Sequence, residues 1–395
     1  MPKPSLKSTI PSFKDESGIN FRMAGEILTL EDPDGIVADL VGLLDGSRET
    51  TGVFTELTGR HPEVTREEFD QALADLDDAR LLHDVDASHE GLTDYDLERW
   101  SRSLGFFETY ATLDRSKYAF QRGIRDTKVA MLGVGGVGSH VLMDLVAMGF
   151  RDIRIVDFDT VELSNLNRQV LYGEQYIGRS KIERAAAWVK GYNSDVTLHT
   201  LEKKLMSADD VYEAVHDRDI VVAAIDRPKT RALTWLNEGC LRAGAALITG
   251  GVDTQRAVHF TILPGVSGCV ACWKSAAHAA DATSRDIYLQ QRTEEDAGLR
   301  FGEDMAAFDG LVALQTAFLV GELIRLATGV STPLSVGRML QVTFQTPVLA
   351  ERETWQRDPD CPTCKGVIAQ PRFAALRDAL TPAPPLVQQG AWPND

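Results

Sequence analysis

The sequence predicts a mixed α/β protein in which a doubly wound, largely parallel sheet follows a small α+β module. Three observations support this prediction. The apolar strand TKVAML leads into the glycine loop GVGGVG and then into an Ala/Leu/Val-rich helical stretch that ends at Gly149. Further apolar strand candidates lie at 220–225, 246–251 and 257–265, and helical stretches separate the first of these strands. Two short strands and three short helices are expected earlier, within residues 21–88.

Composition and charge narrow the class of protein. The chain has 395 residues, of which 44% are hydrophobic and 25% charged, as in a soluble globular protein of two or three domains. No apolar run approaches the roughly 20 residues that span a bilayer, and the first residues lack the apolar core of a signal peptide. We therefore expect a cytoplasmic protein with no membrane partner. The net charge of −17 also disfavours a nucleic acid partner.

The expected N-terminal module, residues 21–88, follows a polar stretch over 1–20 that is interpreted as a flexible tail. FRMAGEILTLED indicates two strands, while DGIVADLVGLLDG and ETTGVFTELTG indicate two helices that stop at Gly. Thr65 and Glu68 have the spacing of a capping box before a third helix. This arrangement is typical of a winged-helix-like module, but the segment is acidic, which argues against DNA binding.

The larger domain is expected over residues 89–370. The stretch 306–329 is predicted to be a buried helix. The polar stretch 274–308 is long for a connection inside a compact domain, so it is either a binding loop or lid, or disordered. The Pro-, Gln- and Ala-rich end, 371–395, is interpreted as a tail.

The glycine loop is the first feature that carries chemistry. Its glycines follow a strand and open a helix, so the backbone could approach a phosphate at the helix N-terminus. Asp157 lies 19 residues after the last of them, at the end of the next strand, where a carboxylate can hold ribose hydroxyls. These features indicate an adenine nucleotide, with NAD as the default; a tight turn without a ligand is the alternative. The glycines are Gly133, Gly135, Gly136 and Gly138.

The residues after Asp157 favour ATP over NAD. A triphosphate needs several cations and a carboxylate that holds Mg²⁺, whereas a dinucleotide needs little charge beyond its pyrophosphate contacts. Asp226 ends the strand IVVAAI, with Arg231 close by in sequence. Any one of these residues could be a solvated surface group, but their combination around one glycine loop favours ATP. The polar and cationic residues before this strand are Asn165, Arg168, Gln169 and Lys181.

From about Arg99 to Cys364 the chain resembles the ubiquitin-activating-like adenylating family of ThiF, MoeB and relatives. The resemblance rests on GVGGVGS, DFDTVELSNLNRQVLY, GRSKIERAA and AAIDRPKTR, of which the SNLNRQ block is the most specific. It implies an ATP-dependent adenylyltransferase with a Rossmann-like domain, and a homodimer in which Arg102 reaches the partner subunit's site. It further implies nucleotide contacts from the glycines and from Asp157, Asp159, Asn165, Arg168, Gln169 and Lys181, a Mg²⁺ ligand in Asp226, and catalytic roles for Arg102, Arg168, Lys181 and Asp226.

Four of the five cysteines form two Cys-x-x-Cys pairs, Cys269/Cys272 and Cys361/Cys364. Two such pairs can complete a tetrahedral thiolate site for a structural zinc ion even when they are far apart in sequence. The alternative is four unrelated reduced thiols. The fifth, Cys240, lies in an apolar helix-like context and is expected in the core. Residues 274–308 contain no cysteine, which argues against a thioester intermediate.

The expected reaction is transfer of AMP from ATP to a peptide carboxylate, with release of pyrophosphate. The N-terminal module and the long stretch before Met305 make the chain similar to the microcin C branch of the family, in which such a module clamps a short ribosomal precursor peptide. That resemblance implies a role in peptide natural-product biosynthesis. The alternatives are adenylation of a Gly-Gly-tailed sulfur-carrier protein, a non-catalytic leader-peptide-binding scaffold, and an NAD-dependent oxidoreductase.

Overall fold

The computed structural model describes residues 1–23, 25–225, 227–228, 230–252, 254–296 and 306–380, and the chain divides into two compact units, Met1–Gly123 and Ile124–Asp395. The sequence had suggested a boundary near residue 88. The first unit extends further because the next two helices bury Trp100, Leu104 and Phe107, and the Phe107 ring stacks on Phe120.

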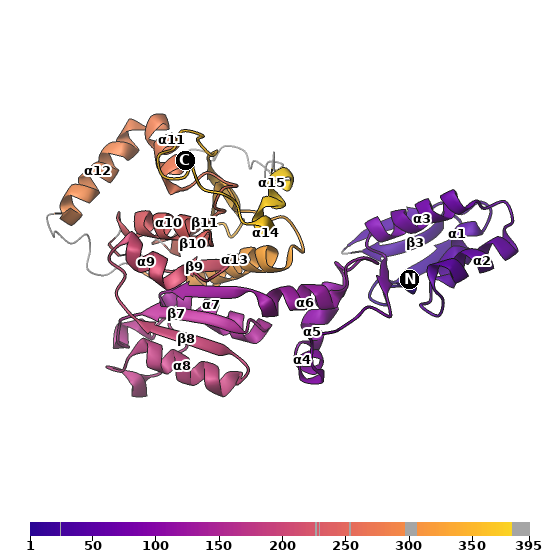
Figure 1. Cartoon of the computed structure of the whole chain (residues 1–395), viewed down its shortest axis with the longest axis horizontal. Coiled ribbons are helices and arrows are strands. Elements are labelled where there is room, and N and C mark those ends of the chain that lie inside the picture. The colour runs from indigo at the N-terminus through magenta and orange to yellow at the C-terminus, as the bar shows by residue number, and fades with distance from the viewer. Residues whose placement is uncertain (24, 226, 229, 253, 297–305, 381–395) are drawn as a thin grey trace. The chain divides into compact units, whose positions relative to one another are not determined.

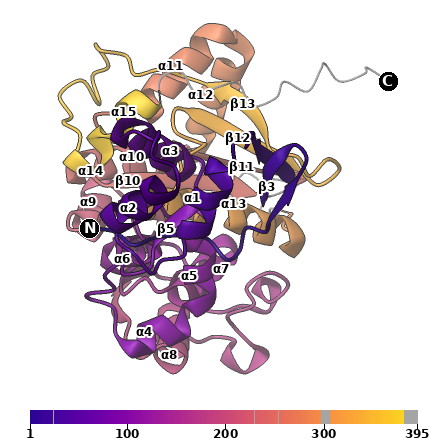
Figure 2. The same cartoon turned by 90° about the vertical axis from the view of Figure 1, so that its right-hand side faces the viewer.

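The first unit is a small α+β fold. Strands β2, β3 and β4 form an antiparallel sheet, and β1 pairs antiparallel with β5. Helices α1, α2 and α3 lie together beside β5 in Figure 2. The strands are β1 Pro4–Leu6, β2 Ser12–Asp15, β3 Gly18–Met23, β4 Glu26–Leu30 and β5 Leu82–Asp84. The helices are α1 Ile36–Leu43, α2 Thr50–Arg60, α3 Arg66–Asp78, α4 Asp94–Arg99 and α5 Ser101–Glu108, with α6, Lys117–Asp126, at the boundary of the units.

The prediction of a flexible tail over residues 1–20 is wrong, because this segment holds β1 and β2. Lys7 lies just after β1 and is almost completely buried. Its Nζ donates to the carbonyl oxygens of Arg80, at 2.6 Å, and Ala111, at 2.7 Å. Burial lowers the pKa of Lys7 to about 8. These two strands escaped prediction because they are three and four residues long and lack an apolar alternation.

The capping box before α3 is confirmed. The backbone N–H of Glu68 donates to Thr65 Oγ1 at 3.2 Å, and the N–H of Thr65 donates to Glu68 Oε2 at 2.9 Å. The helix then buries Phe69, Leu73 and Leu76 on one face, as its periodicity predicts.

The second unit is built on an eight-stranded sheet with the order β13-β12-β11-β10-β9-β6-β7-β8. The five strands from β10 to β8 are parallel, and β11, β12 and β13 extend the sheet antiparallel. This confirms the predicted parallel-dominated α/β fold (Figure 1). The strands are β6 Lys128–Leu132, β7 Asp152–Asp157, β8 Thr197–Glu202, β9 Ile220–Ala223, β10 Ala246–Val252, β11 Arg256–Ile262, β12 Arg338–Thr343 and β13 Ala350–Thr354.

Among the described residues of this unit, four helices connect the parallel strands, three lie between β11 and β12 in the chain, and two follow β13. They are α7 Gly136–Met148, α8 Lys181–Tyr192, α9 Ala208–Val215, α10 Ala232–Ala243, α11 Val270–Ala280, α12 Ala282–Asp296, α13 Asp309–Thr328, α14 Pro371–Ala374 and α15 Leu376–Ala379, with 3₁₀ turns at Leu163–Asn165 and Glu174–Tyr176.

Helix α13 is long and apolar enough to cross a membrane by length and composition alone. It packs instead against α7, β10 and β11, and more than half of its apolar window is buried in the protein. The helix is therefore a core element of the second unit, as the sequence predicts for 306–329.

The stretch 274–308, which the sequence presents as a loop, is helical as far as Asp296, through the end of α11 and the whole of α12. Its Ala, Gln, Arg and Glu residues favour a helix, and its polarity reflects an exposed helix rather than a loop. Residues 297–305 lie outside the described residues. Residues 371–380 also differ from the expected tail, because Phe373 is buried and Arg372 pairs with Asp219 at 3.1 Å; the remainder, 381–395, lies outside the described part.

We expect stability to fall between pH 6.5 and 4 because of His259. This side chain is 1% exposed, and its ring stacks on Phe318. Burial lowers the pKa of His259 from 6.5 to about 4, so over this range the unfolded chain binds a proton that the folded chain does not. Acidification through that window should remove up to about 3 kcal/mol of folding free energy. Urea denaturation of wild type and His259→Asn at several pH values tests this; an equal pH slope in both would contradict it.

Candidate functional site

The glycine loop joins β6 to α7 at the carboxyl edge of the parallel strands. Gly133 has a φ of 89°, and its N–H donates to Val156 O of β7 at 2.8 Å. A Cβ on Gly138 would lie 1.9 Å from Gly133 O. Because that clash is with backbone, no side chain can move to relieve it. The loop is folded so tightly that only glycine fits at position 138.

The backbone N–H and carbonyl of Val134 both form hydrogen bonds to side chains of the protein. Its N–H donates to Asp157 Oδ2 at 2.7 Å, and its carbonyl accepts from the Tyr172 hydroxyl at 2.8 Å. Burial raises the pKa of Tyr172, which stays a protonated donor. The loop is thus braced on its inner side, while the first amides of α7 have no partner within the helix and suit an anion. The sequence had not singled out Tyr172, because only its position in the fold reveals this contact.

Asp157 is buried at the end of β7 and does more than the sequence suggested. Besides the Val134 amide, its carboxylate accepts from the N–H groups of Phe158, at 2.7 Å, and Asp159, at 2.9 Å. Three of about four acceptor positions are therefore occupied. One remains for a hydroxyl, so a ribose contact is compatible with this brace.

The segment after β7 brings Arg168 and Gln169 to the loop. A Cβ on Gly136 would meet Arg168 Cδ at 3.4 Å, and one on Gly135 would meet Gln169 Nε2 at 3.8 Å. Gln169 is buried, and its Oε1 has no partner among the described residues. Such an orphaned acceptor beside a tight glycine loop fits a site completed by a bound ligand.

Asn165 and Lys181 shape the same edge. Asn165 Oδ1 accepts from the N–H of Glu162 at 3.2 Å, which closes the turn ahead of Arg168. Lys181 begins α8, is 6% exposed, and places its Nζ 3.2 Å from Asp159 Oδ2. Burying an ammonium is costly without an anionic partner, and Asp159 offers one that is half exposed. The structure thus gathers Asp157, Asp159, Asn165, Arg168, Gln169 and Lys181 with the four loop glycines on one edge of the sheet.

The described structure does not place two of the expected site residues at the edge of the sheet that carries the glycine loop. Asp226 lies outside the described residues; it follows β9, the parallel neighbour of β6, by three positions. Arg102 lies on α5 of the first unit with its side chain exposed. Both roles rest on sequence resemblance.

The four paired cysteines come together although about 90 residues separate the pairs in sequence. All four are buried, and their sulfur atoms lie within 4.8 Å of one another. Neighbouring sulfurs are 3.6 to 3.9 Å apart. Four thiolates on a tetrahedral zinc ion, at about 2.3 Å from the metal, would be roughly 3.8 Å apart. The cluster therefore fits zinc with no position left open for a substrate.

Two hydrogen bonds hold the backbone around the cysteine cluster. Burial raises the pKa of the Cys269 thiol to about 11, so this cysteine would bind a metal as a thiolate only with the help of the metal's charge. Arg357 Nη2 donates to Cys364 O at 2.8 Å, and the Trp355 indole N–H donates to Gly268 O at 3.1 Å. Cys240, the remaining cysteine, is buried in the core as predicted.

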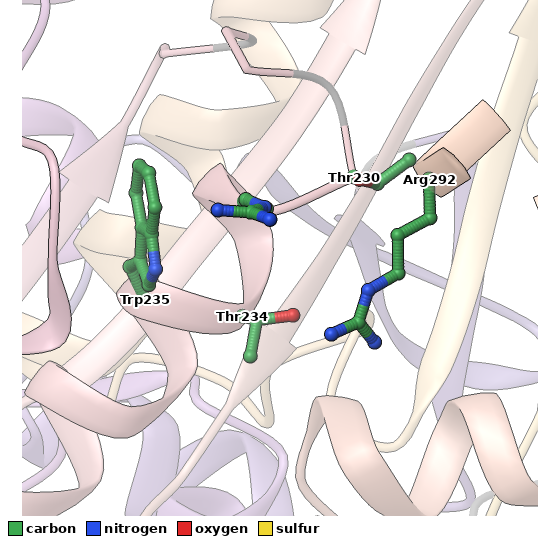
Figure 3. A pocket seen from close by; sticks show the side chains of 5 residues that line it. Thr230, Thr234, Trp235 and Arg292 are labelled. Atoms are coloured by element: carbon green, nitrogen blue, oxygen red, sulfur yellow. The ribbon is translucent and has the colours of Figure 1, made fainter. Parts of the chain in front are cut away.

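A cavity of about 260 Å³ lies at the start of α10. Figure 3 shows Thr234 between Trp235 on one side and Arg292 of α12 on the other. The described residues that line it are Thr230, Arg231, Thr234, Trp235 and Arg292. The sequence analysis did not identify this cavity, because Arg292 reaches it from a segment interpreted as a loop.

Comparison with known proteins agrees with this geometry. A model of the ThiF family matches residues 108–363. The heterocyst protein HesA of Trichormus variabilis is 27% identical over 273 residues, which cover 69% of this chain and 90% of that protein. The SAMP-activating enzyme E1 of Haloferax volcanii is 33% identical over 176 residues, which cover 45% of this chain and 61% of that protein.

The fold also matches solved structures of E. coli MccB. At 21% identity, the match covers 93% of this chain and 98% of MccB with a TM-score of 0.73. MccB in complex with N-formylated MccA matches with a TM-score of 0.70, covering 91% of this chain and 99% of that one. At this level of identity, the similarity shows a shared fold over nearly the whole length of both chains.

Proposed function

The chain belongs to the ThiF family, whose members are ATP-dependent adenylyltransferases, and on this premise we propose that it adenylates the C-terminal carboxylate of a short ribosomal peptide. The observation that carries the proposal is the braced glycine loop with Arg168 and Gln169 packed over it. This arrangement offers backbone amides, a guanidinium and an unsatisfied acceptor to a nucleotide.

The residues suit acyl adenylation without a general base. The attacking carboxylate is already ionised at neutral pH, so the site must align it with the α-phosphorus and neutralise phosphate charge. Amides of the loop and α7, together with Arg168 and Lys181, would hold the phosphates, and Asp157 one ribose hydroxyl. In this proposal Asp226 holds Mg²⁺, whose charge offsets that of the phosphates, and Arg102 contributes from the second subunit of a homodimer.

The length of the match favours a peptide substrate. The correspondence with MccB runs over 93% of this chain and therefore includes most of the first unit. MccB has been solved with the peptide MccA, and we infer a peptide-clamp role for the first unit, which the sequence placed in 21–88. Zinc on the four cysteines would be structural. We further propose that the protein is cytoplasmic and acts in peptide natural-product biosynthesis, without nucleic acid or membrane partners.

A carrier-protein substrate is the second candidate. It is favoured by the similarity to the SAMP-activating enzyme E1 of Haloferax volcanii, an enzyme named for activating SAMP. That relative aligns with only 45% of this chain, whereas the match to MccB covers 93% of it. The peptide is the first choice for this reason.

Pyrophosphate exchange into ATP tests the function directly. Purified protein with Mg²⁺ would be given short free-acid peptides, including ones that end in Asn, or a Gly-Gly-tailed carrier protein. Exchange with peptides alone supports the proposal, and mass spectrometry of the product should show an added AMP. Exchange with the carrier alone would replace the peptide by the second candidate. Peptide binding without any exchange would indicate the non-catalytic scaffold.

The variant Asp226→Ala tests the proposed magnesium site. Loss of the proposed Mg²⁺ ligand should abolish exchange while the circular dichroism spectrum and zinc content stay those of wild type. Full exchange activity in this variant would reject the magnesium assignment.

A further inference from the structure

His140 joins the helix of the glycine loop to the segment that carries Arg168. It lies on α7, one helical turn after Gly136, and its side chain is 16% exposed. Its Nε2 lies 3.1 Å from the carbonyl oxygen of Arg168. Because a carbonyl oxygen can only accept a hydrogen bond, Nε2 carries the proton and donates it. The imidazole therefore fixes the backbone of Arg168 to the second turn of α7.

The side chain of Arg168 runs from this hydrogen bond toward the start of α7. A Cβ on Gly136 would lie 3.4 Å from both the Cδ and the Nε of Arg168. Residues four positions apart lie on the same face of a helix, so His140 faces the backbone of Arg168 where Gly136 faces its side chain. Arg168 is thus held at its carbonyl while its guanidinium lies beside the first turn of α7.

The guanidinium of Arg168 occupies a place that does not favour a cation. The first turn of a helix carries the positive end of the helix dipole, which repels a nearby positive charge and attracts an anion. The hydrogen bonds of Arg168 Nη1 go to uncharged acceptors, Ser164 O at 3.1 Å and Asn167 Oδ1 at 2.9 Å. The position of the guanidinium before an anion binds therefore depends on how firmly the backbone of Arg168 is held.

Asp309, the first residue of α13, is a second group near the same ring nitrogen. Its Oδ1 lies 3.3 Å from His140 Nε2, is buried, and has no hydrogen-bond partner among the described residues. A carboxylate oxygen at this distance favours a ring nitrogen that carries a proton. Since α13 packs against α7, the packing of the two helices keeps this carboxylate beside the imidazole. Asp309 thus supports the donor form of Nε2 on which the hydrogen bond to Arg168 depends.

We propose that His140 is a positioning residue for ATP, which holds Arg168 where its guanidinium meets the phosphates. The inference rests on the proposed function, which assigns Arg168 to the nucleotide. His140 acts through Arg168 and not on the substrate itself. Its loss should therefore matter only while the side chain of Arg168 is present.

His140→Met and His140→Gln separate the hydrogen bond from the volume of the side chain. Met and Gln are close in size, but only the Gln amide can donate to Arg168 O. We expect His140→Met to weaken ATP binding, measured by calorimetry with Mg²⁺, by about tenfold. His140→Gln should stay within about threefold of the wild-type affinity. Equal losses in the two variants, or wild-type affinity in His140→Met, would overturn the inference.

A double-mutant cycle with Arg168→Ala tests whether His140 acts through the guanidinium. In the Arg168→Ala background, adding His140→Met should change the ATP affinity by about twofold or less, because no guanidinium is left to position. An equal fold-change in both backgrounds would show that His140 only maintains the fold, and would overturn the inference.

His216→Met is the matched control. His216 follows α9, is exposed, and places its Nδ1 3.1 Å from Glu213 O, so it also contacts a backbone carbonyl. This variant should bind ATP as wild type does. The expected ATP affinities without any peptide-dependent exchange would refute adenylation and leave the positioning role standing. Loss of exchange in His140→Met at unchanged ATP affinity would overturn that role, and a wild-type protein that binds no ATP would overturn both proposals.

Discussion

Gly138→Ala should reduce kcat/KM for ATP on the order of 100-fold or more, the effect of a displacement of about 1 Å at a reacting centre. The added methyl group would stand 1.9 Å from Gly133 O, and this contact can be relieved only by moving backbone. Movement of the loop would break the brace that Asp157 and Tyr172 maintain at Val134. Pyrophosphate exchange and direct ATP binding by calorimetry should both show the loss.

The matched control is Gly191→Ala near the end of α8, where a Cβ would meet nothing within 4 Å. This change replaces glycine by a better helix former and should stabilise the protein by up to about 1 kcal/mol while leaving ATP binding unchanged. Near-normal ATP affinity in Gly138→Ala would show that the loop is not the nucleotide site.

Loss of the cysteine cluster should have the largest effect on stability. In Cys361→Ser one sulfur ligand is replaced by a poorer oxygen donor, so zinc is lost or weakly held, and three buried thiols are left without their common partner. Zinc binding by small zinc domains contributes about 10 to 16 kcal/mol to their folding, and part of that should be lost here. We expect a fall in Tm of roughly 10 °C or more, measured by thermal unfolding. Metal analysis of wild type should find one zinc per chain.

Cys240→Ala separates loss of the metal from loss of a core thiol. Cys240 is as buried as the cluster residues but lies outside the cluster. The variant should keep its zinc and lose only the packing of one sulfur atom, at a cost of about 1 kcal/mol. A wild-type protein that contains no zinc, or a Cys361→Ser variant as stable as Cys240→Ala, would contradict the structural zinc site.

The fold was predictable wherever short-range patterns carry the information. The strand before Gly133, the capping box of Thr65 and Glu68, and four of the five parallel strands were predicted, whereas β8 was not. Prediction failed for β1 and β2, whose stability depends on partners far along the chain. It failed again for α12, whose polar composition is typical of both loops and exposed helices.

The sequence predicted which residues form the site, but it did not predict how they lie relative to one another. The SNLNRQ block identified Arg168 and Gln169, yet only the fold shows that both pack over the loop glycines. Tyr172 had no local signature. It acts through a hydrogen bond to Val134, 38 positions away, and such a contact exists only after the chain has folded.

The sequence by itself determined the glycines, the polar and cationic residues after β7 and the two cysteine pairs, because each depends on residue type at a fixed local spacing. Only the tertiary structure decided how these groups meet. It showed that Asp157 holds the loop while one of its acceptor positions stays free, and that the four cysteine sulfur atoms lie within 4.8 Å of one another. The physical reason is that spacing constrains neighbours along the chain, whereas long-range packing of the sheet and its helices determines which distant groups come within bonding distance.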